Sequence, residues 1–253
     1  MKLYVQFHLA LTLLLFASFS SSAQPLIKNE VLCIPDSPPY SGQSLQYNGP
    51  LAELIVNSLK VSNIELTLIS PPWARIMRKA KDAKCIIAGL WPTAQRKEHF
   101  YFSTKPVIKQ TLGLYIEKHR QLTDISNGTL ALQRSTYVSK NMPKKAWKFY
   151  DVRSIKQGAQ MLALSRVDAL YAEVGRMSYL LSKNDDLAKK IKLSQPIIEH
   201  VYGYLAVSKK HKNAKSIINA LDSNIEKALL EMKSPEVKYL NLSNKSIEIN
   251  DTN

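Results

Sequence analysis

The stretch GLWPTAQRKEHFYFS, residues 89–103, joins the end of an apolar strand to an aromatic strand through a Pro-Thr turn. Arg96 stands between the two strands, beside hydroxyl and backbone N–H groups. A guanidinium offers two parallel, permanently charged donors, which match the two oxygens of a carboxylate. The stretch therefore predicts a strand end that holds a small carboxylate.

The residues before this stretch alternate between strand and helix patterns. An amphipathic helix is predicted by Leu51, Leu54, Ile55 and Leu59, which recur at helical spacing. The other predicted elements are strands at residues 31–35, 64–69 and 85–90 and a basic helix at 73–83. This order of strand, helix, strand, helix and strand favours a parallel sheet with helices on its faces.

A second series of the same kind follows residue 111. Its predicted strands are residues 112–116, 129–133, 148–152 and 167–172, and its predicted helices are residues 135–142, 155–165 and 175–182. A return strand at residues 203–207 and a long helix at 214–231 are the last predicted elements, and the polar residues from about 243 to 253 lack a core pattern. Two α/β units in series indicate two lobes, each with its own core.

The first 23 residues predict an export signal. They contain Lys2, an apolar run from Leu9 to Phe16, and small residues ending at Ala23. The alternative is a membrane anchor, but the apolar run is shorter than the ~20 residues that span a bilayer. We therefore expect a periplasmic protein that is soluble after cleavage at Ala23.

The chain carries a formal net charge of +15, spread along its whole length. A nucleic-acid-binding protein would gather these charges on one element with interleaved aromatic residues, so nucleic acid is not an expected partner. A solvated basic surface is the favoured interpretation, and attraction to anionic ligands or an acidic membrane surface stays open.

Cys33 and Cys85 are the two cysteines of the chain, and each lies in a short apolar run typical of a strand. In an oxidising compartment this predicts a disulfide between neighbouring strands. The alternative is two buried, unpaired thiols. No metal site is expected, because no histidine cluster accompanies the cysteines.

Five short motifs in a fixed order resemble the bacterial extracellular solute-binding proteins of family 3, the polar amino-acid type that feeds ABC transporters. The motifs are Pro38-Pro39-Tyr40, Gly49, Thr93 with Arg96 and Phe102-Ser103, Gln133-Arg134-Ser135-Thr136, and Arg166-Val167-Asp168-Ala169 before Glu173. The resemblance implies a type II periplasmic binding protein fold, α/β, with two lobes joined by two hinge crossings. Lobe 1 would comprise residues 24–108 and 203–253, and lobe 2 residues 109–202.

The resemblance also implies a ligand-binding cleft between the lobes. Arg96 matches the arginine that binds the ligand's α-carboxylate, although it could instead pair with Glu98 on a surface turn. Ser135 and Thr136 would bind the same carboxylate through hydroxyl and backbone groups, or they could cap a helix. Glu173 stands where the family usually has an aspartate that accepts the ligand's amino group, and its alternative is a surface role.

Some positions depart from the family pattern or add to it. Trp91, two residues after Gly89, replaces a small hydroxyl residue, which implies a flatter and more apolar or cation-accepting cleft. Tyr40 and Trp73 are further candidates for aromatic walls, although Trp73 could simply pack its helix on the sheet. Arg75 could supply a second positive group, or it could be a solvated helix residue.

The predicted function is the binding of a small carboxylate-bearing ligand, an amino acid or a related compound, by a monomer without a cofactor. The predicted macromolecular partner is an ABC permease; a free-standing sensor that acts through a membrane receptor is the alternative. A dehydratase-like enzyme is a further alternative on this fold. It is disfavoured because Arg176 or its neighbours occupy the place of the catalytic glutamate, and no known catalytic motif occurs.

Overall fold

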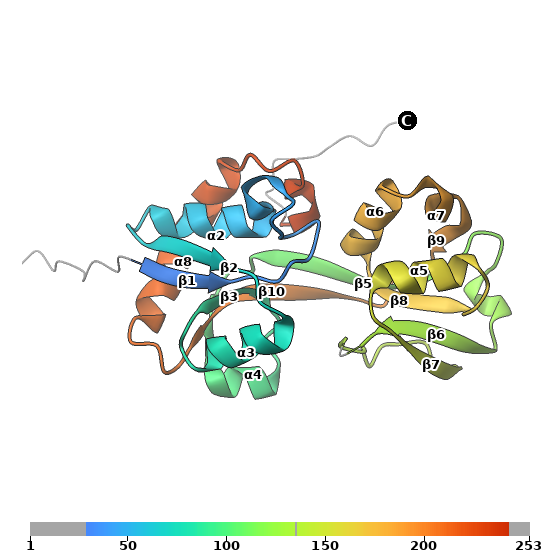
Figure 1. Ribbon diagram of the computed structural model, residues 1–253. Helices are drawn as coiled ribbons and strands as arrows, with labels where there is room; N and C mark the ends of the chain where they lie inside the picture. The colour runs from blue at the N-terminus through green and yellow to red at the C-terminus, as the bar shows by residue number, and fades with distance from the viewer. Residues whose placement is uncertain (1–28, 135, 243–253) are drawn as a thin grey trace, which may run out of the picture.

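The computed structural model describes residues 29–134 and 136–242. The predicted signal peptide and Ser135 lie outside these residues. Two α/β lobes are joined by two long strands, β5 (Ile108–Glu117) and β10 (Glu199–Ser208), which pair antiparallel to each other (Figure 1). The two-lobed α/β fold predicted from the sequence is confirmed.

The strands of both lobes form one sheet in the order β2-β1-β3-β10-β5-β8-β6-β7, with β4 on β10 and β9 on β5. Lobe 1 contains β1 (Asn29–Cys33), β2 (Glu65–Ile69), β3 (Ile86–Leu90) and β4 (Phe100–Phe102). Lobe 2 contains β6 (Asn127–Gln133), β7 (Ala146–Val152), β8 (Ala169–Glu173) and β9 (Ile191–Leu193). Within the lobes β1 pairs parallel with β2 and β3, and β6 pairs parallel with β7 and β8. The carboxyl ends of these parallel strands face the gap between the lobes.

Helices cover the sheet on both sides of lobe 1. Its helices are α2 (Pro50–Lys60), α3 (Trp73–Lys81), α4 (Ala94–His99) and α8 (Ala214–Leu230), with 3-10 turns η1 (Gln46–Asn48) and η3 (Val237–Leu240). The lobe 2 helices are α5 (Ile155–Ala163), α6 (Val174–Ser182) and α7 (Asp185–Lys190), with the 3-10 turn η2 (Leu122–Asp124). In lobe 1, α2 and α8 pack on one face of the sheet and form one hydrophobic core with it. On the other face, α3 forms a second core with the sheet.

The start of α2 shows how local sequence sets the lobe 1 core. Pro50 occupies the first helical position, where its missing N–H is not needed. Gly49 precedes it with φ +88, and a Cβ there would lie 2.6 Å from the carbonyl oxygen of Tyr40. The predicted apolar face, Leu51 and Leu54 included, is buried against β3 and α8.

The disulfide predicted between Cys33 and Cys85 is present. Cys33 ends β1, and Cys85 directly precedes β3, which pairs with β1. Their Cα atoms are 5.7 Å apart, within the range that a disulfide bridges without moving the backbone. The bond lies in the core under α3 and links two adjacent strands.

The helix predicted at residues 135–142 is wrong for the described residues 136–142. They form an irregular segment and a turn. The Ser139 N–H donates to the Tyr171 hydroxyl at 3.2 Å, and Glu199 accepts hydrogen bonds from the Ser139 hydroxyl and the Asn141 amide. These partners on β8 and β10 hold the segment against the sheet face opposite α5 and α6.

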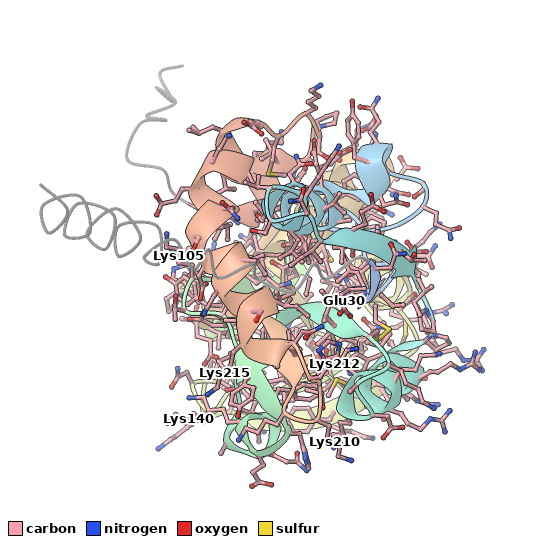
Figure 2. All side chains as sticks on the ribbon, turned by 90° about the vertical axis from the view of Figure 1, so that its left-hand side faces the viewer. Glu30, Lys105, Lys140, Lys210, Lys212 and Lys215 are labelled. Carbon is pink, nitrogen blue, oxygen red and sulfur yellow. A yellow bond between two sulfur atoms is a disulfide. The ribbon has the colours of Figure 1, made fainter. Side chains whose placement is uncertain are left out.

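The basic surface is visible at the end of lobe 1. Figure 2 shows Lys105, Lys210, Lys212 and Lys215 around α8 and the loop before it. Lys105 forms a salt bridge of 2.8 Å with Glu226 on exposed side chains. Within residues 29–134 and 136–242, helices long and apolar enough to cross a bilayer are absent.

Candidate functional site

A cavity of about 710 Å³ opens between the two lobes. Lobe 1 lines it with the segments that follow β1, β2 and β3, and lobe 2 with the segment after β6 and the first turn of α6. Ligands of α/β proteins bind outside the carboxyl ends of parallel strands, where loops can bring polar groups together. This interlobe cavity is therefore the candidate functional site.

Arg96 lies on the lobe 1 wall of the cavity. The Thr93 hydroxyl caps α4 by accepting the Arg96 N–H at 3.4 Å, which fixes where the side chain leaves the backbone. Its Nη1 donates to the Trp91 carbonyl oxygen at 3.0 Å, and its Cζ lies 6.0 Å from the centre of the Trp73 ring. Burial lowers the pKa of the guanidinium, which nevertheless stays charged at neutral pH.

A salt bridge between Arg96 and Glu98 is not formed, and Arg96 has no carboxylate within 4.0 Å among the described residues. One Nη group is held by the backbone, so the remaining guanidinium N–H groups can meet a ligand. The geometry leaves a half-buried positive charge on the cavity wall without an internal counter-ion.

Two tryptophans form the aromatic part of the lobe 1 wall. Trp73, at the start of α3, is 41% exposed and lies under the Arg96 guanidinium. The Trp91 Nε1 donates to the Gln110 side-chain oxygen at 2.9 Å. The Trp91 ring also meets Tyr137 of lobe 2 edge to face, with centroids 5.5 Å apart. Both rings line the cavity, and the Trp91 contact bridges the lobes.

Two further residues predicted from the sequence, Gly89 and Arg75, bring no side chain to the cavity wall. Gly89 lines the cavity with φ +75, and a Cβ on the facing Gly203 would lie 2.8 Å from the Gly89 Cα. It serves close packing of β3 on β10, where glycine alone leaves room. Arg75 is exposed on α3 and does not line the cavity, although its neighbour Ala74 does.

On lobe 2, Thr136 lines the cavity while its backbone N–H donates to the Gln133 carbonyl oxygen at 3.1 Å. That N–H group is therefore taken by the turn after β6. The helix N-terminus expected at this place is missing, because residues 136–142 are not helical. Only the Thr136 hydroxyl is left as a candidate ligand contact, and Ser135 lies outside the described residues.

Glu173 lies behind the cavity wall rather than on it. It is buried, and its two carboxylate oxygens accept the N–H groups of Gly175 at 2.9 Å and Arg176 at 2.8 Å. This is the hydrogen-bonding pattern of a helix N-cap. Its negative charge is thus directed at the backbone of the first turn of α6.

Tyr40 forms a contact between the lobes. It is 3% exposed in the lobe 1 core, and a Cβ built on Gly175 of lobe 2 would lie 2.1 Å from its hydroxyl oxygen. Burial and the nearby Glu173 carboxylate hold the pKa of the phenol well above its ordinary value. Its hydroxyl has no hydrogen-bond partner among the described residues. The Tyr40 hydroxyl therefore packs against the first turn of α6, and Tyr40 does not line the cavity.

Sequence reasoning assigned no ligand contact to Arg176, which projects from the first turn of α6 to the cavity. Its Nη1 donates to the Gln133 side-chain oxygen at 3.3 Å. Burial lowers the pKa of the guanidinium, and the negative charge of Glu173 opposes that shift. The signal in the sequence was its position three residues beyond the end of β8, where first-turn side chains reach a cleft.

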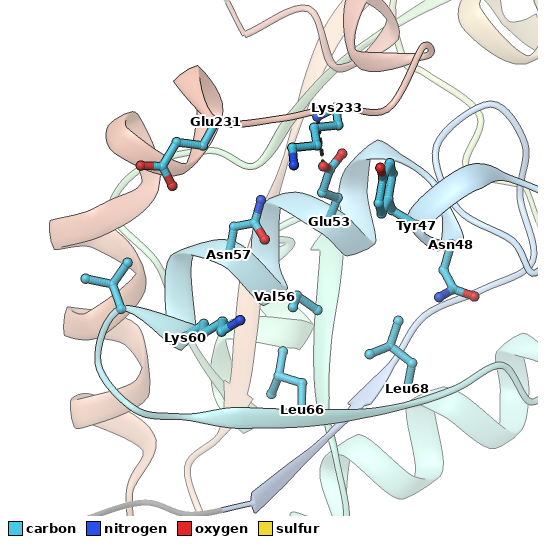
Figure 3. A pocket seen from close by; sticks show the side chains of 11 residues that line it. Tyr47, Asn48, Glu53, Val56, Asn57, Lys60, Leu66, Leu68, Glu231 and Lys233 are labelled. Atoms are coloured by element: carbon cyan, nitrogen blue, oxygen red, sulfur yellow. Dashed lines mark hydrogen bonds between the residues drawn. The ribbon is translucent and has the colours of Figure 1, made fainter.

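A second hollow, of about 800 Å³, lies on the outer side of lobe 1 beside α2 and β2 (Figure 3). Its one buried carboxylate, Glu53, accepts the backbone N–H groups of Lys233 and Ser234 at 2.8 and 2.9 Å. Both oxygens of Glu53 thereby hold the segment after α8. Residues of lobe 1 alone line this hollow, so the two lobes cannot close over a ligand there.

Groupings of three or more metal-ligating side chains do not occur within the part of the chain that the structure describes. The site consists of guanidinium, amide, hydroxyl and aromatic groups, which suits recognition of an anionic organic molecule.

No protein-family model and no curated protein sequence matches the chain. Solved structures with the same fold do. An ancestral arginine-binding protein bound to arginine is 16% identical with a TM-score of 0.64, covering 81% of this chain and 94% of its own. The amino acid ABC transporter substrate-binding protein AbpA from Streptococcus pneumoniae, bound to L-arginine, is 18% identical with a TM-score of 0.63, covering 84% and 92%.

The GluR0 ligand-binding core from Nostoc punctiforme, in complex with L-glutamate, is 16% identical with a TM-score of 0.61, covering 79% of this chain and 96% of its own. At these identities the likeness concerns the fold. The chain has the type II periplasmic binding protein fold, as in substrate-binding proteins of amino acid ABC transporters.

Proposed function

We propose that this protein binds a small carboxylate-bearing solute between its lobes and delivers it for ABC-type uptake, with Arg96 holding the carboxylate. The observation that carries the proposal is the half-buried Arg96 guanidinium, which faces the cavity without an internal carboxylate. A charge in that position is poorly solvated and gains most from an anionic ligand that offers two oxygens. The proposed compartment is the periplasm.

Closure of the lobes would bring the remaining groups to the ligand. We propose lobe boundaries at residues 24–108 with 203–253 and at 109–202, so that the crossings lie in β5 and β10. Trp73 and Trp91 would cover apolar parts of the ligand, and Thr136, with Ser135, would contact it from lobe 2. Water exclusion on closure strengthens such polar contacts.

The fold neighbours support an amino acid or a related compound, since two are bound to arginine and one to glutamate. The catalytic alternative finds no support in the cavity. Among its described lining residues the one carboxylate is Asp36, and histidine does not occur. Delivery to a membrane sensor instead of a permease would use the same closure.

The test is a thermal-shift screen of amino acids, dicarboxylates and short peptides, guided by mass spectrometry of any ligand that stays bound through purification. Arg96→Gln should weaken the best ligand ~10- to 150-fold, the loss expected for a charge-assisted bidentate pair. Arg75→Gln is the matched control, because it removes an arginine from the same lobe outside the cavity. A ligand that binds Arg96→Gln as tightly as wild type would show that the carboxylate is held elsewhere.

A further inference from the structure

We propose that the ligand carries two separated carboxylates and that Arg176 binds the second, so that the cleft selects a dicarboxylate over an amino acid of the same length. This inference rests on the proposed function, since it concerns the same cleft and takes Arg96 as the first carboxylate site. It identifies Arg176 as a specificity-determining residue on lobe 2.

The balance of charge on the cavity walls is the first argument. Arg96 lines the cavity from lobe 1, and Arg134 and Arg176 line it from lobe 2. The one carboxylate among the described lining residues, Asp36, is exposed. Its Oδ1 lies 2.2 Å from the place where a Cβ on Gly42 would be, so this oxygen is turned toward its own loop. The walls therefore carry positive charge that the protein does not neutralise.

The second argument is that the strong acceptors near the cavity, apart from Asp36, each already accept a hydrogen bond from within the protein. The Gln110 oxygen accepts from Trp91, and the Gln133 oxygen accepts from Arg176. Both oxygens of Glu173 accept from backbone N–H groups of α6. A ligand ammonium needs such acceptors when it leaves water, whereas an anionic group needs donors. Apart from Asp36, the charged groups on the cavity walls are the donors Arg96, Arg134 and Arg176.

The third argument is the placement of Arg176 itself. Its backbone is fixed in the first turn of α6, and its Nη1 is oriented by Gln133. Its guanidinium forms no salt bridge within 4.0 Å to Glu173 or to any other described carboxylate. Glu173 supplies negative charge behind the arginine without occupying its donors. An ammonium at this place would meet a like charge, which disfavours it.

The experiment measures binding by calorimetry for two matched series of equal chain length: glutarate, 5-aminovalerate and valerate, and succinate, 4-aminobutyrate and butyrate. In at least one series the dicarboxylate should bind at least tenfold tighter than both its amino and its unsubstituted counterpart. Arg176→Gln should reduce the dicarboxylate to the affinity of the monocarboxylate, whose own affinity should stay within about twofold. Arg176→Lys should fall between, because it keeps the charge and loses the bidentate donors.

Without ligand, the Arg176 variants should unfold at the same temperature as wild type, which establishes that the fold is kept. Arg166→Gln, at an exposed arginine on the outside of lobe 2, is the control for removing a charge. An amino acid that binds as tightly as its dicarboxylate partner overturns the inference and leaves the proposed function standing, provided that Arg96→Gln weakens its binding at least tenfold. Tighter binding of inorganic phosphate than of any dicarboxylate also overturns it. Failure of every carboxylate, or binding that ignores Arg96→Gln, sinks the proposed function itself.

Discussion

Replacing Gly175 with alanine should push the two lobes apart without harming either one. The added methyl group would lie 2.1 Å from the Tyr40 hydroxyl oxygen and 3.1 Å from its Cζ. Tyr40 cannot swing aside, because its ring is buried in the lobe 1 core. Ordinary contact begins near 3.4 Å, so the phenol and α6 must separate by roughly 1.3 Å.

The cost falls on the arrangement in which Tyr40 is seated on α6. Overpacking of this kind costs about 1–3 kcal/mol, so a ligand whose binding keeps Tyr40 packed on α6 should bind ~5- to 150-fold more weakly. Lobe 2 by itself should not suffer. Gly175 has no positive φ and lies in the first turn of α6, where alanine is a better helix former.

The assay pairs calorimetry with small-angle scattering, which reports the radius of gyration with and without ligand. Gly158→Ala is the matched control, because its new methyl group would lie 2.6 Å from Leu170 within lobe 2. That variant should lower the unfolding temperature and leave the dissociation constant unchanged. Wild-type affinity and compaction in Gly175→Ala would refute the idea that the ligand-bound protein keeps Tyr40 packed on Gly175.

Replacing Cys33 and Cys85 with alanine removes a link across 52 residues and should lower the free energy of unfolding by about 4 kcal/mol. A double variant as stable as wild type in urea unfolding would contradict this. Burial raises the pKa of Asp168, but hydrogen bonds from the Thr129 N–H and from Arg120 outweigh it and lower the pKa below its ordinary value of 3.8. The carboxylate therefore stabilises the fold above pH 3.8 and loses this effect as pH falls through the lower folded pKa. Asp168→Asn should flatten that part of the curve of unfolding free energy against pH. An unchanged curve would show that Asp168 contributes nothing to stability.

The alternation of strands and helices was predictable because each element buries its own apolar face. The spacing of Leu51, Leu54, Ile55 and Leu59 marked α2, and the apolar runs around Cys33 and Cys85 marked two strands that the disulfide joins. Such patterns are local, so a sequence alone reveals them.

The segment at residues 136–142 was not predictable in this way. Its irregular form depends on Tyr171 and Glu199, which lie on strands more than 30 residues away in the chain. The same holds for the cleft. Arg176 lies in the same cavity wall system as Arg96 and Trp91 of the other lobe, and only the packing of the two lobes brings these residues together.

The position of β10 between β3 and β5 has a consequence for the order in which the protein can fold. Lobe 1 lacks a central strand and the helix α8 until residues 199–230 exist, although its first strands are made before lobe 2. Lobe 2 is drawn from one continuous run, from β5 to β9, and can bury its core without waiting. We therefore expect the half that is begun second to be finished first, and a late truncation to damage the half that is begun first.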